Sequence, residues 1–214
     1  MKKTVSILIA ILFVGFGFAQ DEDKAKEILD KASAKMKGYS TLTIKFGLTI
    51  KTVDSDDPIK QNGTIQIKDG KYKLDMDDQE VYNDGKTITT FLEEDNECYT
   101  SEVDEADEDF ISPEDLLTIW EDGYKFKYGG DTEYAKEKCD VIFLYPTNPK
   151  LSKFHTIKLL INQETNRVVW IHLKGKDGSK MTYKLLDLQR DLEMDDSTFK
   201  FNPAEHPGVE CYDE

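Results

Sequence analysis

Large apolar residues alternate strictly with small or charged residues along 41–51, where the sequence is T-L-T-I-K-F-G-L-T-I-K. Successive side chains of a β-strand point to opposite faces, so this alternation predicts a strand with one apolar face. That face carries Leu42, Ile44, Phe46, Leu48 and Ile50, whereas the other carries mostly threonine and lysine. An apolar face in water requires cover, either from the protein's own core or from a carried ligand.

Similar alternation, together with turn-forming residues, predicts further strands along most of the chain. Asn83-Asp84-Gly85 and Asp177-Gly178 are typical of hairpin turns, because asparagine and glycine tolerate a positive φ. No βαβ rhythm is visible, so we expect a sheet that is antiparallel throughout. The predicted strand segments are 42–51, 64–76 with a bend at Asp69-Gly70, 81–91 around the turn at Asn83, 98–101, 124–128, 139–145, 155–162, 167–174 and 179–187.

Two helices are predicted. The first spans 21–37 and ends before Gly38, a residue suited to a helix C-cap. Its apolar positions share one helical face: Ala25, Ile28, Leu29, Ala32 and Met36.

The second predicted helix is short. Ser112 is a typical N-cap, with Pro113 at the first helical position and Asp115 at the third. The apolar residues that follow would wrap most of its circumference, so it is either buried core or a lid over something apolar: Leu116, Leu117, Ile119 and Trp120.

Residues 1–19 have the features of a secretory signal peptide cleaved after Ala19. Lys2 and Lys3 precede an apolar run over 5–18, and Gly17 and Ala19 are the small residues before the predicted cut. We therefore expect an exported, periplasmic protein whose mature part, 20–214, is a single domain. No cysteine follows the cut, so no lipid anchor on the protein itself is expected.

Loss of the two leader lysines would change the formal charge from −15 to −17. A surface this acidic repels phosphate backbones, so nucleic acids and anionic membranes are poor expected partners. Cys98, Cys139 and Cys211 remain, of which at most one pair can form a disulfide within the chain, and the sequence leaves the pairing open.

Candidate catalytic and metal-binding residues are few. The histidines are His155, His172 and His206, and no nucleophile elbow, zinc motif or phosphate-binding loop accompanies them. The acidic clusters at 54–57, 75–78 and 104–109 lack the spacing of a calcium loop and are typical of solvated turns. We expect no enzyme activity, cofactor or metal.

Apolar strand residues, by contrast, are abundant, and two helices are too few to cover a wide curved sheet. The residues that could line one concave face are Leu42, Ile44, Phe46, Leu48, Ile50, Ile65, Ile67, Tyr72, Leu74, Met76, Phe91, Phe143, Leu159, Ile161 and Ile171.

The order of these motifs resembles the LolA family of periplasmic outer-membrane lipoprotein carriers. The resemblance spans nearly all of the mature chain, and its motifs are individually weak but specific in their order. The residues that carry it are Ala25, Ile28, Leu29, 39–46, 63–67, Val81, 84–87, the terminal F-K-F-N-P at 199–203, and 207–209.

The resemblance implies a mainly β (α+β) fold, an open, unclosed antiparallel β-barrel, or half-barrel, whose helices cover an apolar cavity for acyl chains. The implied lid residues are Leu116, Leu117, Ile119 and Trp120. The implied wall residues are Ile44, Phe46, Leu48, Ile65, Ile67, Leu74, Phe91, Phe143, Leu159 and Ile171.

One feature departs from the family pattern. Well-known members have an arginine in the second strand that bonds across to the lid, whereas this chain has Lys68-Asp69-Gly70 there. The chain's arginines are Arg167 and Arg190, so the resemblance supplies no residue for that latch.

The leading hypothesis is a non-enzymatic, monomeric carrier for acylated lipoproteins or other lipids. By resemblance, it would receive cargo from an inner-membrane releasing complex and deliver it to an outer-membrane acceptor. Two alternatives remain open: a lipid-sensing or partner-binding regulator on the same fold, and a lipid-directed hydrolase with a dispersed site near His155 or His172.

Overall fold

The computed structural model describes residues 16–55, 57–103 and 117–213. Within them the chain forms one α-helix, twelve β-strands and two 3-10 helices. The helix is α1 (Phe16–Lys37), and the 3-10 helices are η2 (Asp196–Phe199) and η3 (Pro203–Glu205). The strands are β1 (Thr41–Lys51), β2 (Ile59–Lys68), β3 (Lys71–Met76), β4 (Gln79–Asn83), β5 (Thr87–Leu92), β6 (Glu97–Glu102), β7 (Tyr124–Tyr134), β8 (Glu137–Pro146), β9 (Phe154–Asn162), β10 (Val168–Gly175), β11 (Lys180–Arg190) and β12 (Glu210–Asp213).

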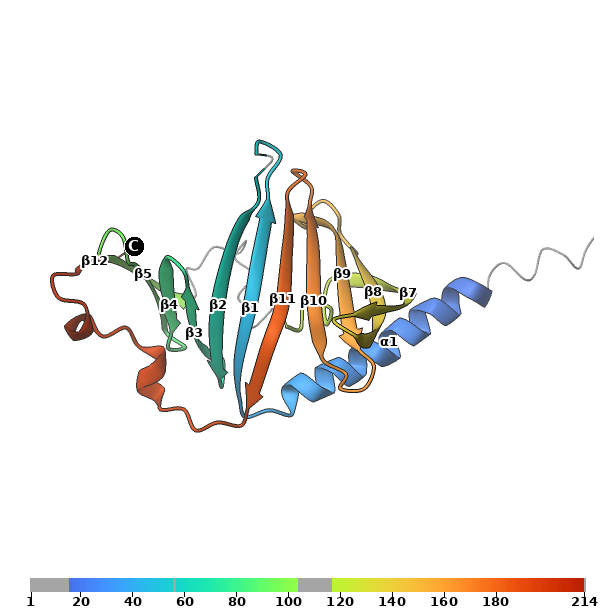
Figure 1. Cartoon of the computed structure of the whole chain (residues 1–214), viewed down its shortest axis with the longest axis horizontal. Helices are drawn as coiled ribbons and strands as arrows, with labels where there is room; N and C mark the ends of the chain where they lie inside the picture. Colours follow the sequence, from blue (N-terminus) through green and yellow to red (C-terminus); the bar gives the residue numbers. More distant parts are fainter. Residues whose placement is uncertain (1–15, 56, 104–116, 214) are drawn as a thin grey trace, which may run out of the picture.

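All twelve strands belong to one curved sheet, in the order β12-β6-β5-β4-β3-β2-β1-β11-β10-β9-β8-β7. The end strands β12 and β7 lie at opposite sides of the molecule (Figure 1), so the barrel is open, as predicted. Every pair is antiparallel except β12 with β6, which is parallel. The prediction of an antiparallel sheet throughout was therefore wrong at this edge, where a strand that the sequence pattern did not reveal is added.

The predicted segment 64–76 is two strands rather than one bent strand. Asp69 and Gly70 have φ of 49° and 76°, so the chain reverses there and β2 pairs with β3 as a hairpin. Glycine adopts this left-handed conformation without steric cost, which favours the turn. The hairpin of β4 and β5 around Asn83 is confirmed.

Helix α1 covers one part of the concave face. Its predicted apolar residues Ala25, Ile28, Leu29 and Ala32 are buried against the inward-facing residues of β8, β9 and β10. A second apolar cluster consists of the inward-facing residues of β1, β2, β3 and β4 together with Leu117. Met181, Tyr183 and Leu185 of β11 contact both clusters, so the two share one concave face.

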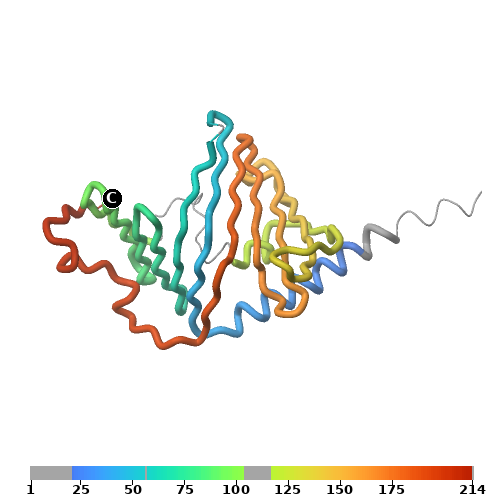
Figure 2. Tube along the Cα trace, in the orientation of Figure 1, coloured from blue at the N-terminus to red at the C-terminus, as the bar shows by residue number. Residues whose placement is uncertain are grey.

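The C-terminal segment after β11 runs beneath the sheet and rises to its far edge, as the tube trace shows (Figure 2). Phe199 is completely buried, and the ring of Phe201 stacks on Phe91 at 5.3 Å. We call residues 191–213 the C-terminal strap. It covers the outer face of β4, β5 and β6, the side opposite the concave face.

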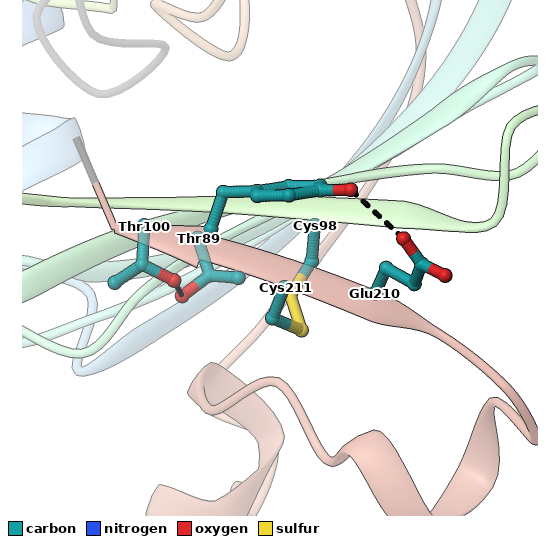
Figure 3. The surroundings of a disulfide bond; sticks show 6 residues. Thr89, Cys98, Thr100, Glu210 and Cys211 are labelled. Atoms are coloured by element: carbon teal, nitrogen blue, oxygen red, sulfur yellow. Dashed lines mark hydrogen bonds between the residues drawn. A yellow bond between two sulfur atoms is a disulfide. The ribbon is translucent and has the colours of Figure 1, made fainter.

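A disulfide between Cys98 and Cys211 fastens the strap to β6, with the Cα atoms 4.4 Å apart (Figure 3). This resolves the pairing that the sequence left open. The hydroxyls of Thr89 and Thr100 lie 3.1 Å apart beside it, on paired positions of β5 and β6. Cys139 is free and buried.

Candidate functional site

An apolar cavity of about 470 Å³ lies on the concave face, between the part covered by α1 and the β2–β4 part of the sheet. Its volume is in the range typical of small-molecule sites. Among the described residues it is lined by Ile44, Phe46, Leu48, Ile50, Gln61, Ile65, Leu74, Met76, Gln79, Leu117, Lys153, Phe154, Ile171, Leu173, Met181, Tyr183 and Leu185.

Strand register assembles this wall. Ile44 pairs with Ile65 of β2, which pairs with Leu74 of β3, so the three side chains form one row across the sheet. On the other side, Leu48 pairs with Tyr183 of β11, which pairs with Ile171 of β10. Residues paired in register across neighbouring strands share a face, so the alternation noted in the sequence converges on one surface.

Phe46 occupies the centre of the wall because its partner position is a glycine. Phe46 pairs with Gly63, and its ring lies where a Cβ at position 63 would be. The ring also packs against Tyr183, with centroids 5.9 Å apart. Burial raises the pKa of the Tyr183 phenol, so this group stays neutral and the wall carries no charge there.

Polar residues gather at one end of the cavity. Ile44 is 1 % exposed, whereas Ile50, at the far end of the same strand, is partly exposed, so the cavity opens toward the β1–β2 turn. Gln61 lies on β2 near this end, and Lys153 lies beside the β10–β11 turn, where its carbonyl accepts a bond from the Lys176 amide at 3.0 Å. Gln79 begins β4 at the same end.

Six of the ten predicted wall residues line this cavity: Ile44, Phe46, Leu48, Ile65, Leu74 and Ile171. Ile67 lines a smaller cavity of about 320 Å³ on the other side of Leu117. Leu159 is fully buried in the cluster beneath α1.

Phe91 and Phe143 lie elsewhere, which corrects their predicted placement. Phe91 pairs with Glu80 and Cys98, on the outer face, and stacks on the strap at Phe201. Phe143 falls between the inward-facing Ile142 and Leu144, and packs outside with the cluster of Cys139, Val141 and Leu160.

The sequence prediction missed lining residues on β11. Met181, Tyr183 and Leu185 alternate with polar residues and all face the cavity. This is the same period-two signal as in β1, and it would have identified them. Leu173 of β10 and Phe154 of β9 are further apolar lining residues that it missed.

Of the predicted lid, Leu116 and the start of the predicted helix lie outside the described residues, and 117–120 form a turn. Leu117 lines the cavity, whereas Ile119 and Trp120 pack into the core beneath α1. The Trp120 Nε1 donates to Ser33 Oγ of α1 at 2.8 Å. Beside it, Lys37 donates to Glu121 at 2.7 Å and lowers the pKa of that carboxyl.

Lys68, in the stretch where the family arginine was expected, points to the strap. Its Nζ donates to the Met194 carbonyl at 2.8 Å and to Asp196 at 2.9 Å. Lys71 binds the same carboxylate at 2.7 Å. The contacts at this position therefore hold the strap against the outer face.

The histidines proposed for a hydrolase do not line the cavity. His155 is exposed. His172 pairs with Lys158 and Thr182, stacks on Trp170 at 5.4 Å, and its pKa is lowered by burial and nearby lysines. Within the described ranges, no three His, Cys, Asp or Glu side chains are grouped so that they could hold a metal ion.

The fold and the cavity define a class of architecture: an open half-barrel with an apolar hollow on its concave face. The family model described as outer membrane lipoprotein carrier protein LolA matches residues 16–138, more than half of the chain. The chain therefore belongs to the LolA family, a family of carriers that bind lipids or lipoproteins. None of the curated proteins matches the chain.

The solved structures that match the chain are distant in sequence. An uncharacterized conserved protein from Thermus thermophilus superposes with a TM-score of 0.59 at 9% identity, covering 89% of this chain and 99% of that one. The lipoprotein LppX from Mycobacterium tuberculosis gives 0.49 at 10% identity, covering 81% and 100%. A LolA superfamily protein from Nitrosomonas europaea gives 0.42 at 11% identity, covering 83% and 97%. At these identities the likeness concerns the fold alone.

None of the helices in the described part of the chain is both long and apolar enough to cross a membrane. Helix α1 begins at Phe16, upstream of the predicted cleavage point after Ala19. Cleavage itself stays a prediction, as does the single mature domain over 20–214.

Proposed function

We propose that this protein is a periplasmic carrier that shields the acyl chains of lipoproteins in its cavity and moves them from the inner to the outer membrane. The observation that carries the proposal is the cavity of about 470 Å³ on the concave face, whose wall is almost entirely aliphatic and aromatic. Its partners would be an inner-membrane releasing complex and an outer-membrane acceptor, and the carrier would act as a monomer without catalysis.

The energetics agree with a carrier. Burying one methylene gains about 0.8 kcal/mol, so an acyl chain of about fifteen methylenes gains on the order of 12 kcal/mol when fully covered. A free acylated protein in water is disfavoured by a comparable amount. A half-open wall that is almost entirely apolar lowers this cost. It also permits release, because non-directional contacts can be lost gradually as the acyl chain leaves.

The test is the binding of an acylated peptide to the mature protein, measured by displacement of the neutral fluorophore N-phenyl-1-naphthylamine. Met181→Glu places a charge on a partly exposed part of the wall, and we expect its affinity to fall by roughly a hundredfold, because a carboxylate facing an apolar ligand is desolvated. Leu48→Trp, which narrows the cavity without adding charge, should also weaken binding.

Leu186→Glu is the matched control. Leu186 belongs to the same strand as Met181 but is 64% exposed and does not line the cavity. Its affinity should equal that of the wild type. Circular dichroism and a thermal melt establish folding of each variant, and unchanged binding in folded Met181→Glu and Leu48→Trp proteins would refute the proposal.

A further inference from the structure

We infer that the open end of the cavity is a docking surface for an anionic lipid bilayer. The surface comprises the described residues of three segments, 51–60 without residue 56, 148–153 and 174–180, which we call the rim. This inference rests on the proposed function, since a carrier whose cavity opens against a bilayer transfers acyl chains without exposing them to water.

The three segments of the rim lie next to one another. A Cβ added at Gly178, in the β10–β11 turn, would meet the side chain of Val53, in the β1–β2 turn. Lys176 of the same turn donates its side chain to the Pro149 carbonyl and its amide to the Lys153 carbonyl. Figure 1 shows the β1–β2 and β10–β11 turns side by side, projecting beyond the rest of the sheet.

Apolar side chains project from this rim into solvent. Leu151 is 80% exposed, Val53 is 70% exposed and Ile59 is 55% exposed. Among the described residues, Leu151 and Val53 are the most exposed of the large apolar side chains. Exposed apolar residues gathered around the entrance of an apolar cavity are typical of an interaction surface.

The charge of the rim is opposite to that of the whole chain. The sequence over these three ranges, with Asp56 counted, contains seven lysines and four aspartates, a net charge of +3, in a chain of net charge −15. Lys153 also lines the cavity itself. The turn between β3 and β4 adds Asp77 and Asp78 beside the rim, where they bond the Asn62 amide and the Gln61 side chain, respectively.

Lysines around exposed apolar side chains fit an anionic interface. Lysines close to a negatively charged leaflet strengthen binding, and each apolar side chain that enters the acyl region adds further affinity. The acidity of the whole chain, which predicts repulsion from anionic membranes, therefore does not describe this end of the molecule. The acidic remainder of the surface would be repelled by the anionic bilayer, which would turn the rim toward the membrane.

The experiment is flotation of the full mature protein with vesicles of phosphatidylcholine, with and without phosphatidylglycerol, at low salt. We expect roughly tenfold stronger binding to the vesicles that contain phosphatidylglycerol. Leu151→Glu and Val53→Glu should each weaken that binding by roughly tenfold or more. Both residues are exposed, so neither change is expected to affect folding.

Leu186→Glu again serves as the matched control and should bind vesicles like the wild type. Equal binding to both kinds of vesicle, no binding to either, or an equal loss in Leu186→Glu would each overturn the inference. Met181→Glu separates the two proposals: it should lose acylated peptide yet still float with vesicles. A protein that binds acylated peptide but never floats would refute the docking surface alone.

Discussion

The two halves of the sheet are covered on opposite faces. On β8 to β10, helix α1 and Trp120 cover the concave face with a buried apolar cluster. On β4 to β6, the C-terminal strap covers the outer face, through Phe199, Phe201 and the disulfide. The strands between them keep an inner face that neither element covers, and the cavity lies there. The comparison shows why the cavity is there: helix α1 covers the concave face over only part of the sheet, and the C-terminal strap covers the other face.

The largest expected difference in stability is between a substitution beneath α1 and one in the cavity wall. Leu29→Ala, beneath α1, should lower the free energy of unfolding by about 3 kcal/mol, because it creates a new cavity in a packed cluster. Leu48→Ala should lower it by about 1–2 kcal/mol, because that side chain already borders empty space and loses fewer contacts. Urea denaturation measures both, and equal losses would show that the wall is as tightly packed as the core.

The next effect concerns how the strap is held. Cys211→Ser should lower the free energy of unfolding by about 2–4 kcal/mol, because the disulfide closes a loop across a separation of 113 residues. Reductant should destabilise the wild type by the same amount and leave Cys211→Ser unchanged. If the variant unfolds at the same urea concentration as the wild type, the strap contributes nothing to global stability. Acyl binding should survive in the variant, since the strap lies on the other face.

The smallest effect is electrostatic and also concerns the strap. Lys71 and Lys68 lower the pKa of Asp196 from its ordinary 3.8 to about 2. Since the folded-state pKa lies below the unfolded-state pKa, ionised Asp196 stabilises the fold above a pH of about 4, and this contribution is lost as the pH falls toward 2. The carboxylate is exposed, so the effect is modest and screened by salt.

Asp196→Asn tests this by urea titration at several pH values. The variant should be less stable than the wild type at pH 7, and the difference should vanish near pH 2. Glu193→Gln, which removes a charge from the same strap, is the control and should show a smaller, less pH-dependent change. A constant difference between Asp196→Asn and the wild type at every pH would exclude the ion pairs as its cause.

Strand alternation predicted the cavity wall well where one face is apolar and the other polar. In β1 and β2, Ile44, Phe46, Leu48 and Ile65 reach the cavity as expected. The prediction failed at Phe143 because β8 is apolar on both faces. The sequence of the strand alone does not indicate which of the two faces is concave. At Phe91 it failed because β5 has apolar residues on both faces: Ile88 and Phe91 are three positions apart and point to opposite sides, and Leu92 follows Phe91 directly.

The strap could not be predicted from local pattern at all. β12 has four exposed residues and no alternation of buried and exposed positions, and it pairs with a strand formed far earlier in the chain. Its position depends on long-range contacts, such as those of Asp196 with Lys68 and Lys71. The F-K-F-N-P motif was recognised by resemblance, but its role in covering the outer face became visible only in three dimensions.

The pairing of β12 with β6 also fixes an order of events during synthesis. β6 is made more than a hundred residues before the strand that pairs with its outer edge, so this edge stays unprotected until β12 has been synthesised. Unpaired strands invite pairing with other chains. β6 is short and carries a glutamate at each end, Glu97 and Glu102, which opposes such pairing until β12 is in place.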